Sequence, residues 1–165
     1  MSLDLRRLTV ADAPALRALR IEAFTLHPRD FRSSPEDEAA QPLATLETLL
    51  ARDHFVGFFD GETLVGAAGL IIEPRAKLAH KGLIASVYLR ASHRGHGRAE
   101  RMLRALLAAA EGKVEAVHLN ASVGNDAALR LYQRLGFEVW ATEPRALKLP
   151  DGDYVDELSM VRRLP

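Results

Sequence analysis

The residues best suited to chemistry lie in one glycine-containing turn, SHRGHGRAERML, at positions 92–103. An alanine- and leucine-rich stretch typical of a helix follows it, yet the opening residues are cations: Arg94, His96, Arg98 and Arg101. The N-terminal end of a helix carries partial positive charge, so each cation there costs roughly a few tenths of a kcal/mol unless an anion neutralises it. The turn therefore predicts an anionic ligand.

Gly95 and Gly97 make the same turn suitable for a phosphate or pyrophosphate. Glycine has no side chain, so a ligand can approach the backbone, and the free N–H groups of a first helical turn point outward to meet it. A tight turn with solvated basic residues is the alternative. NAD and ATP are disfavoured, because Glu100 replaces the third glycine of a dinucleotide fingerprint and no G-x-x-x-x-G-K-[ST] motif occurs.

Hydrophobic patterns predict the elements that position this turn. Strands are expected at 3–8, 54–60, 63–73, 83–90, 114–122, 145–149 and 154–162, and helices at 11–26, 42–52, 98–111 and 125–135. The proline- and serine-containing segment 27–42 is predicted to be a loop, and the apolar run 83–90 a strand buried on both faces. This order indicates a mixed α/β or α+β fold with a right-handed β-α-β crossover over 83–122.

Composition narrows the class of protein. The 165 residues fit one domain, and 48% hydrophobic with 27% charged residues is typical of a soluble protein. The chain has no cysteine, no secretory leader and no membrane-length apolar stretch, which predicts a cytoplasmic protein. Net charge is zero, but seven acids and one base fall within 36–62, and eight bases and one acid within 75–104.

Two motifs carry a resemblance to a known family. Residues 94–99, RGHGRA, resemble the Arg/Gln-x-x-Gly-x-Gly/Ala signature of the GNAT superfamily of acyl-CoA-dependent N-acetyltransferases. The run N-x-x-A-x-x-L-Y-x-x-L-G-F at 125–137 resembles its second hallmark, at matching separation. The resemblance implies one N-acetyltransferase domain over 1–165. Its sheet would be mixed, mostly antiparallel and of about seven strands, flanked by about four helices, with the fourth and fifth strands splayed.

The resemblance also implies how acetyl-CoA, the co-substrate, is held. The backbone of the turn would bind the pyrophosphate, through Arg94, Gly95, His96, Gly97, Arg98 and Ala99. The pantetheine arm would lie like an extra strand beside Val87 and Leu89. Asn125 would help to hold the arm, although a favoured N-cap residue at the start of a helix would look the same.

Catalytic roles follow from the resemblance less completely. Tyr132 would protonate the departing thiolate, although a core tyrosine on an apolar helix face would look the same. Many relatives carry a glutamate in the fourth strand, but positions 84–87 read Ile-Ala-Ser-Val. We therefore expect the amine to lose its proton through ordered water. The chain of water would end at one of these residues: Glu22, Asn120, Asp156 or Glu157.

The acceptor is a primary amine of a small molecule or peptide in this interpretation. Candidate contacts in the first helix and the following segment are Phe24, Phe31, Ser33 and Ser34. The acid excess at 36–62 suggests a cationic acceptor.

Two other functions stay open. One is a non-catalytic acyl-CoA-binding sensor, and the other is a nucleic-acid binder that uses the basic block at 75–104. Few aromatics accompany that block, so nucleic acid is not expected as a partner. The lack of a membrane-length apolar stretch likewise predicts no membrane partner. The six histidines lack metal-ligand spacing, so no metal is expected. Sheet edges could pair two copies into a homodimer.

Overall fold

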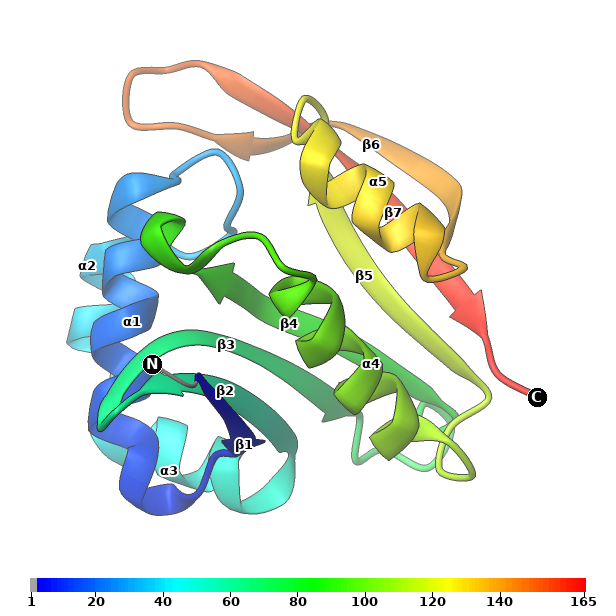
Figure 1. Ribbon diagram of the computed structural model, residues 1–165. Coiled ribbons are helices and arrows are strands. Elements are labelled where there is room, and N and C mark those ends of the chain that lie inside the picture. Colours follow the sequence, from blue (N-terminus) through cyan, green and yellow to red (C-terminus); the bar gives the residue numbers. More distant parts are fainter. Residues whose placement is uncertain (1–2) are drawn as a thin grey trace.

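The computed structural model describes residues 3–165, and its seven strands form one sheet in the order β1-β2-β3-β4-β5-β7-β6 (Figure 1). The strands are β1 (Asp4–Arg7), β2 (His54–Asp60), β3 (Thr63–Ile72), β4 (Lys81–Leu89), β5 (Ala116–Ser122), β6 (Glu138–Lys148) and β7 (Tyr154–Arg163). All neighbours pair antiparallel except β4 and β5, which are parallel. The mixed, mostly antiparallel sheet expected from the sequence is confirmed.

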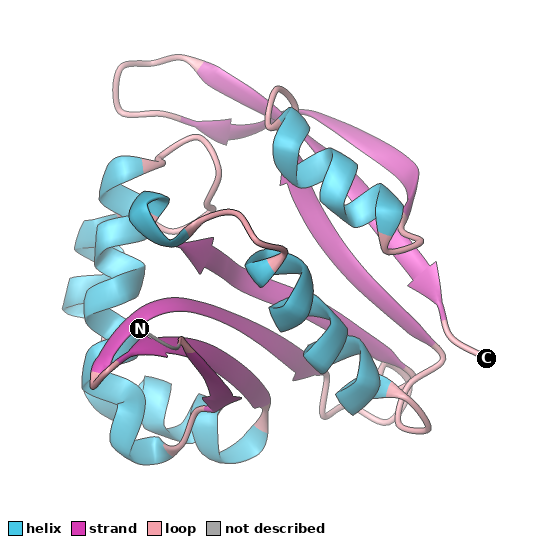
Figure 2. Ribbon diagram, viewed as in Figure 1, coloured by secondary structure: helices cyan, strands magenta, loops and turns pink. Residues whose placement is uncertain are grey.

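Helices cover both sides of this sheet (Figure 2). They are α1 (Ala13–Leu26), α2 (Pro35–Ala40), α3 (Leu43–Arg52), α4 (Arg98–Ala110) and α5 (Asp126–Arg134), with short 3₁₀ turns at Val10–Asp12 and Ala91–His93. The helix α4 forms the crossover between the parallel strands β4 and β5, as expected.

Three local predictions were wrong. The segment 27–42 contains the helix α2, whose N-cap Ser34 accepts a hydrogen bond from the Asp37 N–H, 3.0 Å away. The strand β6 begins at Glu138 rather than 145 and is almost entirely solvent-exposed, so it lacks the apolar alternation that marks a strand. The strand β4 is buried only in part: Leu83, which still pairs with β5, is 39% exposed, and residues 85–87, beyond that pairing, are half-buried.

Two apolar cores lie on opposite sides of the sheet. Phe58 and Leu70 pack with α4 and α5 on one side, whereas Phe55 and Phe59 pack with α1 and α3 on the other. The hairpin β2–β3 supplies both sets, because successive strand residues point to opposite faces. Its turn contains Gly61, whose φ of +59° favours glycine.

The parallel strands β4 and β5 are joined over a short length only. Residues 81–83 pair with residues 116–118, and beyond them the two strands share no ladder. Figure 1 shows them diverging toward the end of the sheet at which the 92–97 turn and the start of α5 lie. The expected splay of the fourth and fifth strands is therefore present.

A buried ion pair ties α2 to α1 and to the splayed strand. Arg20 makes two hydrogen bonds to Glu38, of 2.8 and 2.9 Å, and a third of 2.6 Å to the Ser86 hydroxyl on β4. Glu38 is only 2% exposed. Breaking such a pair leaves one buried charge without its partner, which is costly.

We therefore expect Glu38→Ala to lower the free energy of unfolding by about 3 to 5 kcal/mol. The exposed Glu36 on the same helix provides the control, and Glu36→Ala is expected to cost less than about 1 kcal/mol. Urea denaturation of both variants measures the difference. Equal, small losses would contradict the role assigned to the pair.

Candidate active site

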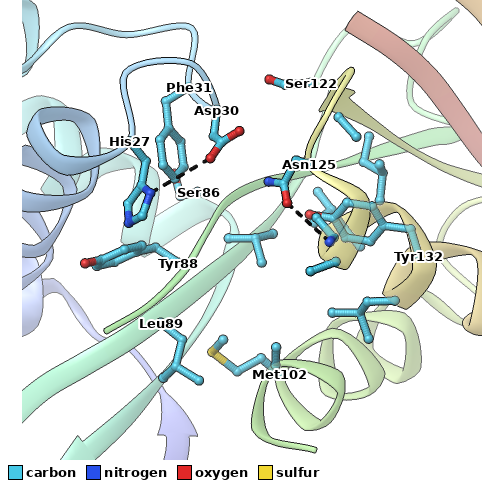
Figure 3. A pocket seen from close by; sticks show the side chains of 18 of the residues that line it. His27, Asp30, Phe31, Ser86, Tyr88, Leu89, Met102, Ser122, Asn125 and Tyr132 are labelled. Carbon is cyan, nitrogen blue, oxygen red and sulfur yellow. Dashed lines mark hydrogen bonds and ion pairs between the residues drawn. The ribbon is translucent and has the colours of Figure 1, made fainter. Parts of the chain in front are cut away.

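The main pocket lies where β4 and β5 separate, and has a volume of about 480 Å³. Its walls come from residues 84–89 of β4 and 119–122 of β5, from the 94–99 turn, from α5 and from the loop after α1. Figure 3 shows Tyr88 and Leu89 on one side of it and Asn125 and Tyr132 on the other. A pocket of this size is typical of a small-molecule site.

The glycine turn presents free backbone donors to solvent. Gly95, His96 and Gly97 have φ of +88°, +53° and +67°, so three successive residues are left-handed. The N–H groups of Gly95, His96, Gly97, Ala99 and Glu100 have no acceptor within residues 3–165. An added Cβ at either glycine would meet nothing within 4 Å, so a ligand can reach these donors. Successive free N–H groups at a helix N-terminus form an anion site.

The cations of this turn are held partly by the protein itself. Arg94 donates from Nε to the Leu89 carbonyl at 3.0 Å, and Arg98 donates to the His93 carbonyl at 2.9 Å. Arg101 lies over the Phe58 ring, 5.2 Å from its centroid. Neutral carbonyls and an aromatic face do not cancel the positive charge, so the turn remains favourable for an anion.

The inner edge of β4 offers backbone groups to the pocket. Leu89 lies opposite Gly66 of β3, while the Arg90 N–H bonds to the Val65 carbonyl at 2.9 Å. This alternation directs the polar backbone atoms of Leu89 away from β3, toward the gap. Val87 also lines the pocket, next to Ser86, whose φ of +58° accompanies the irregular pairing of β4 with β3.

The helix α5 contributes Asn125 and Tyr132. Asn125 is the N-cap, and its side-chain oxygen accepts from the Ala128 N–H at 3.3 Å. Tyr132 is 7% exposed and its ring contacts Phe137, yet its hydroxyl has no hydrogen-bond partner in residues 3–165. Burial, and secondarily the charge of Asp30, raises the pKa of Tyr132 to about 12. The hydroxyl therefore stays protonated at neutral pH.

The structure separates the four candidate ends of the proton path. Glu22 is held by Arg90 at 2.8 Å and by the Tyr88 hydroxyl at 3.0 Å, and Arg90 lowers its pKa. Glu157 is 3% exposed and bonded to Arg32, whereas Asp156 is solvent-exposed. None of these carboxylates lines the pocket.

Asn120 does line the pocket, and its side-chain oxygen accepts from Ser159 at 3.1 Å. It is therefore the one of the four candidates that the fold brings to the site.

Of the predicted acceptor contacts, likewise, some lie at the pocket and others do not. Phe31 lines the pocket, and Phe24 packs behind it with ring centroids 5.1 Å apart. Ser34 caps α2, and neither it nor Ser33 reaches the pocket. The acids at 36–62 also lie outside the lining, so they give no support to a cationic acceptor.

Sequence reasoning missed three polar residues at this end of the pocket: His27, Asp30 and Tyr88. His27 Nδ1 lies 4.0 Å from the Asp30 carboxylate, and its ring centroid is 5.8 Å from that of Tyr88. No motif marks them, because His27 and Asp30 come from a loop whose path depends on distant partners. The Arg29 carbonyl accepts from the Ser122 hydroxyl on β5, for example.

Two further features were searched in the described chain. No helix of residues 3–165 is both long and apolar enough to cross a membrane. The same residues contain no group of three or more His, Asp or Glu arranged to hold a metal ion.

A splayed sheet with free N–H groups at one end and a pocket between the strands is suited to an extended ligand with an anionic end. The model of the GNAT acetyltransferase family matches residues 15–137. An N-alpha-acetyltransferase, RimI, from Mycobacterium tuberculosis is 33% identical over 132 residues, which cover 79% of this chain and 75% of that protein.

Solved structures show the same fold. A GNAT acetyltransferase from Streptococcus pneumoniae has a TM-score of 0.86 at 19% identity, covering 99% of this chain and 100% of its own. A putative acetyltransferase, yncA, from Salmonella typhimurium was solved with its cofactor acetyl-CoA. It has a TM-score of 0.82 at 20% identity, covering 100% and 95%. The chain belongs to the GNAT family and is an acetyl-CoA-dependent N-acetyltransferase.

Proposed function

We propose that this domain, residues 1–165, transfers the acetyl group of acetyl-CoA directly to a primary amine in a ternary complex, with Tyr132 as the general acid. The observation that carries the proposal is the continuity of the pocket. It runs from the free N–H groups of the 94–99 turn, along the inner edge of β4, to the buried Tyr132.

Each part of this pocket has a chemical task. The turn N–H groups bind the pyrophosphate, with positive charge from Arg94 and Arg98 and the ring of His96 nearby. Backbone groups of Val87 and Leu89, with Asn125 opposite, hold the pantetheine arm. Acetyl-CoA supplies the thioester. Tyr132 donates its proton to the departing sulfur, which its raised pKa permits because the hydroxyl is not ionised near pH 7.

The acceptor class is a primary amine of a small molecule or a peptide. The relative from Mycobacterium tuberculosis is named an N-alpha-acetyltransferase, which favours a peptide N-terminus for this chain as well. The absence of cysteine from the sequence supports a cytoplasmic location.

A sensor that binds acyl-CoA without turnover is the second candidate, favoured by the absence of a carboxylate at positions 84–87. Release of CoA thiol with a panel of amines and free-N-terminal peptides separates the two. Acetyl-CoA-dependent release that requires an amine supports the enzyme, and binding without release across the panel supports the sensor.

A homodimer through β6 is a further proposal. This strand forms an edge of the sheet and exposes Trp140 by 63% and Val139 by 44%. Exposed strand edges readily pair with another chain. Light scattering is expected to give the mass of a dimer, and that of a monomer for Trp140→Glu. A monomeric wild type would contradict the pairing.

A further inference from the structure

Asp30 is the only carboxylate among the pocket-lining residues of the described chain. It lies on the loop between α1 and α2, and its side chain is 30% exposed. Figure 3 shows its carboxylate beside His27, on the opposite side of the pocket from Tyr132. Neither a sequence motif nor the proposed reaction above gives this residue a task.

Asp30 differs from the other acids near the site in having no strong ionic partner. Its one ion-pair neighbour within residues 3–165 is His27, at 4.0 Å. Glu22, Glu38 and Glu157, by contrast, are each bonded to an arginine at 2.9 Å or less. A carboxylate without a strong partner can accept a hydrogen bond or a proton from a ligand.

The position of Asp30 relative to Tyr132 suits the two ends of one transfer reaction. The negative charge of Asp30 acts across the pocket on Tyr132 and contributes to its raised pKa. Both residues also line the same pocket, so the proton donor for the leaving sulfur and a proton acceptor for the attacking nitrogen face the same space.

We propose that Asp30 binds the acceptor's ammonium group and takes the proton that the nitrogen loses during attack, with His27 as its positioning residue. The inference rests on the proposed function and assigns the base of that reaction. His27 is suited to hold Asp30, because its Nδ1 faces that carboxylate while its Nε2 contacts Arg94 Nη2 at 3.3 Å.

The proton balance of this step closes. The bound ammonium first loses one proton to water, and the nitrogen lone pair then forms a bond to the thioester carbon. A second N–H proton passes to Asp30, and the C–S bond breaks as Tyr132 gives its proton to sulfur. Asp30 returns its proton to the Tyr132 oxygen through water. The products are an N-acetyl amide, free CoA thiol and one proton released to solvent.

The surroundings of Asp30 also specify the acceptor. Phe31 and Tyr88 lie beside it, with ring centroids 6.5 Å apart in an edge-to-face arrangement. Aromatic faces next to a carboxylate favour a compact cation. Butylamine and the N-terminus of a short peptide share this chemistry, so both belong in the test.

The test compares CoA-thiol release for wild type, Asp30→Asn and Asp30→Glu, with the exposed acid Asp37 changed in the control Asp37→Asn. We expect Asp30→Asn to lower kcat/KM at least about 100-fold and Asp30→Glu to recover part of the loss. Asp37→Asn should leave kcat/KM unchanged. The thermal shift with acetyl-CoA should be the same in all four proteins, which separates this inference from the proposed function.

His27→Gln tests the positioning role. The charged or titratable groups that face His27 are Asp30, Arg94 and Tyr88. Removing the imidazole is expected to move the pH at which kcat/KM falls on the acid side, with a smaller loss at neutral pH than in Asp30→Asn. An unchanged pH profile would show that His27 is only structural.

Direct binding completes the test for acceptors that turn over slowly. Butylamine and the free-N-terminal peptide should each shift the His27 ring proton signals in NMR to saturation in wild type but not in Asp30→Asn. An N-acetylated peptide should not shift the His27 signals in either wild type or Asp30→Asn. Intact turnover in Asp30→Asn, or no shift with either amine, overturns the assignment of Asp30. If acetyl-CoA gives no thermal shift in the wild-type protein, the proposed function is overturned instead.

Discussion

Gly97→Glu is expected to abolish the stabilisation that acetyl-CoA gives the wild-type protein. A ligand at about 100 times its Kd adds about 2.7 kcal/mol to the free energy of unfolding, which at this chain length raises Tm by roughly 5 to 10 °C. The glutamate carboxylate would stand among free N–H groups that we assign to the pyrophosphate. Two like charges about 4 Å apart near a surface repel by about 4 kcal/mol, so we expect Kd to rise at least about 100-fold.

The chain contains a matched control for this change. Gly112 has a φ of +70°, close to the +67° of Gly97, and an added Cβ meets nothing within 4 Å at either position. Both substitutions therefore carry the same left-handed backbone cost, of about 1 to 2 kcal/mol. Gly112 follows α4 at the end away from the pocket, so Gly112→Glu should keep the full acetyl-CoA shift.

Differential scanning fluorimetry with acetyl-CoA, and with NAD and duplex DNA as negative ligands, measures these shifts. A shift that survives in Gly97→Glu would place the pyrophosphate elsewhere. If duplex DNA raises the Tm of the wild-type protein as much as acetyl-CoA does, the nucleic-acid interpretation of the basic block at 75–104 is favoured.

Tyr132→Phe is expected to lower kcat by about 100- to 10,000-fold while leaving acetyl-CoA affinity and stability nearly unchanged. The substitution removes only a hydroxyl, and that hydroxyl bonds to nothing within residues 3–165, so the packing against Phe137 is kept. Because the pKa of Tyr132 is about 12, its acid form persists as pH rises. The wild-type kcat should therefore show no fall due to Tyr132 between about pH 7 and pH 10.

Tyr154→Phe is the control, since Tyr154 lies at the start of β7, outside the pocket lining. Single-turnover measurements of thiol release separate the chemical step from product release. A Tyr132→Phe enzyme with wild-type kcat would make Tyr132 a core residue only, and would leave ordered water as the proton source for the leaving sulfur.

The strongest sequence predictions were those in which local and long-range signals agree. The turn before α4 combines glycine conformations, a helix N-terminus and a motif, and the structure gives it three left-handed residues with free N–H groups. The start of α5 at Asn125 likewise follows from capping chemistry alone.

For α2 and β6, the local sequence signals were masked by neighbouring residues that favour a different structure. Ser34-Pro35-Glu36-Asp37 has the N-cap, the N1 proline and the early acids of a helix start, and α2 begins there. The prolines and serines around it favoured a loop. In β6, Pro144 and the exposed residues hide the strand, because an edge strand tolerates proline and needs no apolar face.

The acceptor end could not be predicted because its geometry is made by distant contacts. His27 and Asp30 reach the pocket only after their loop is anchored to β5 and β7, through Ser122 and Glu157. Hydrogen bonds between residues so far apart in the sequence leave no local pattern from which they could be predicted. The same holds for Glu22, which lies on the expected helix and is bonded to Arg90 and to the hydroxyl of the pocket residue Tyr88, but does not itself line the pocket.

The short pairing of β4 with β5 has a mechanical consequence. Within residues 3–165, the strand ladder that connects β1–β4 to β5–β7 is confined to residues 81–83 and 116–118, next to hydrogen bonds from residues 115 and 116 to the His80 carbonyl, so the two halves of the sheet are joined at one end. Near the other end, a bound pantetheine arm that pairs with the strand edges would connect the two halves for as long as the ligand stays bound. Acetyl-CoA would then support the fold as well as react. Its binding would restrict the motion of one half-sheet relative to the other, and release of CoA would restore that motion in each catalytic cycle.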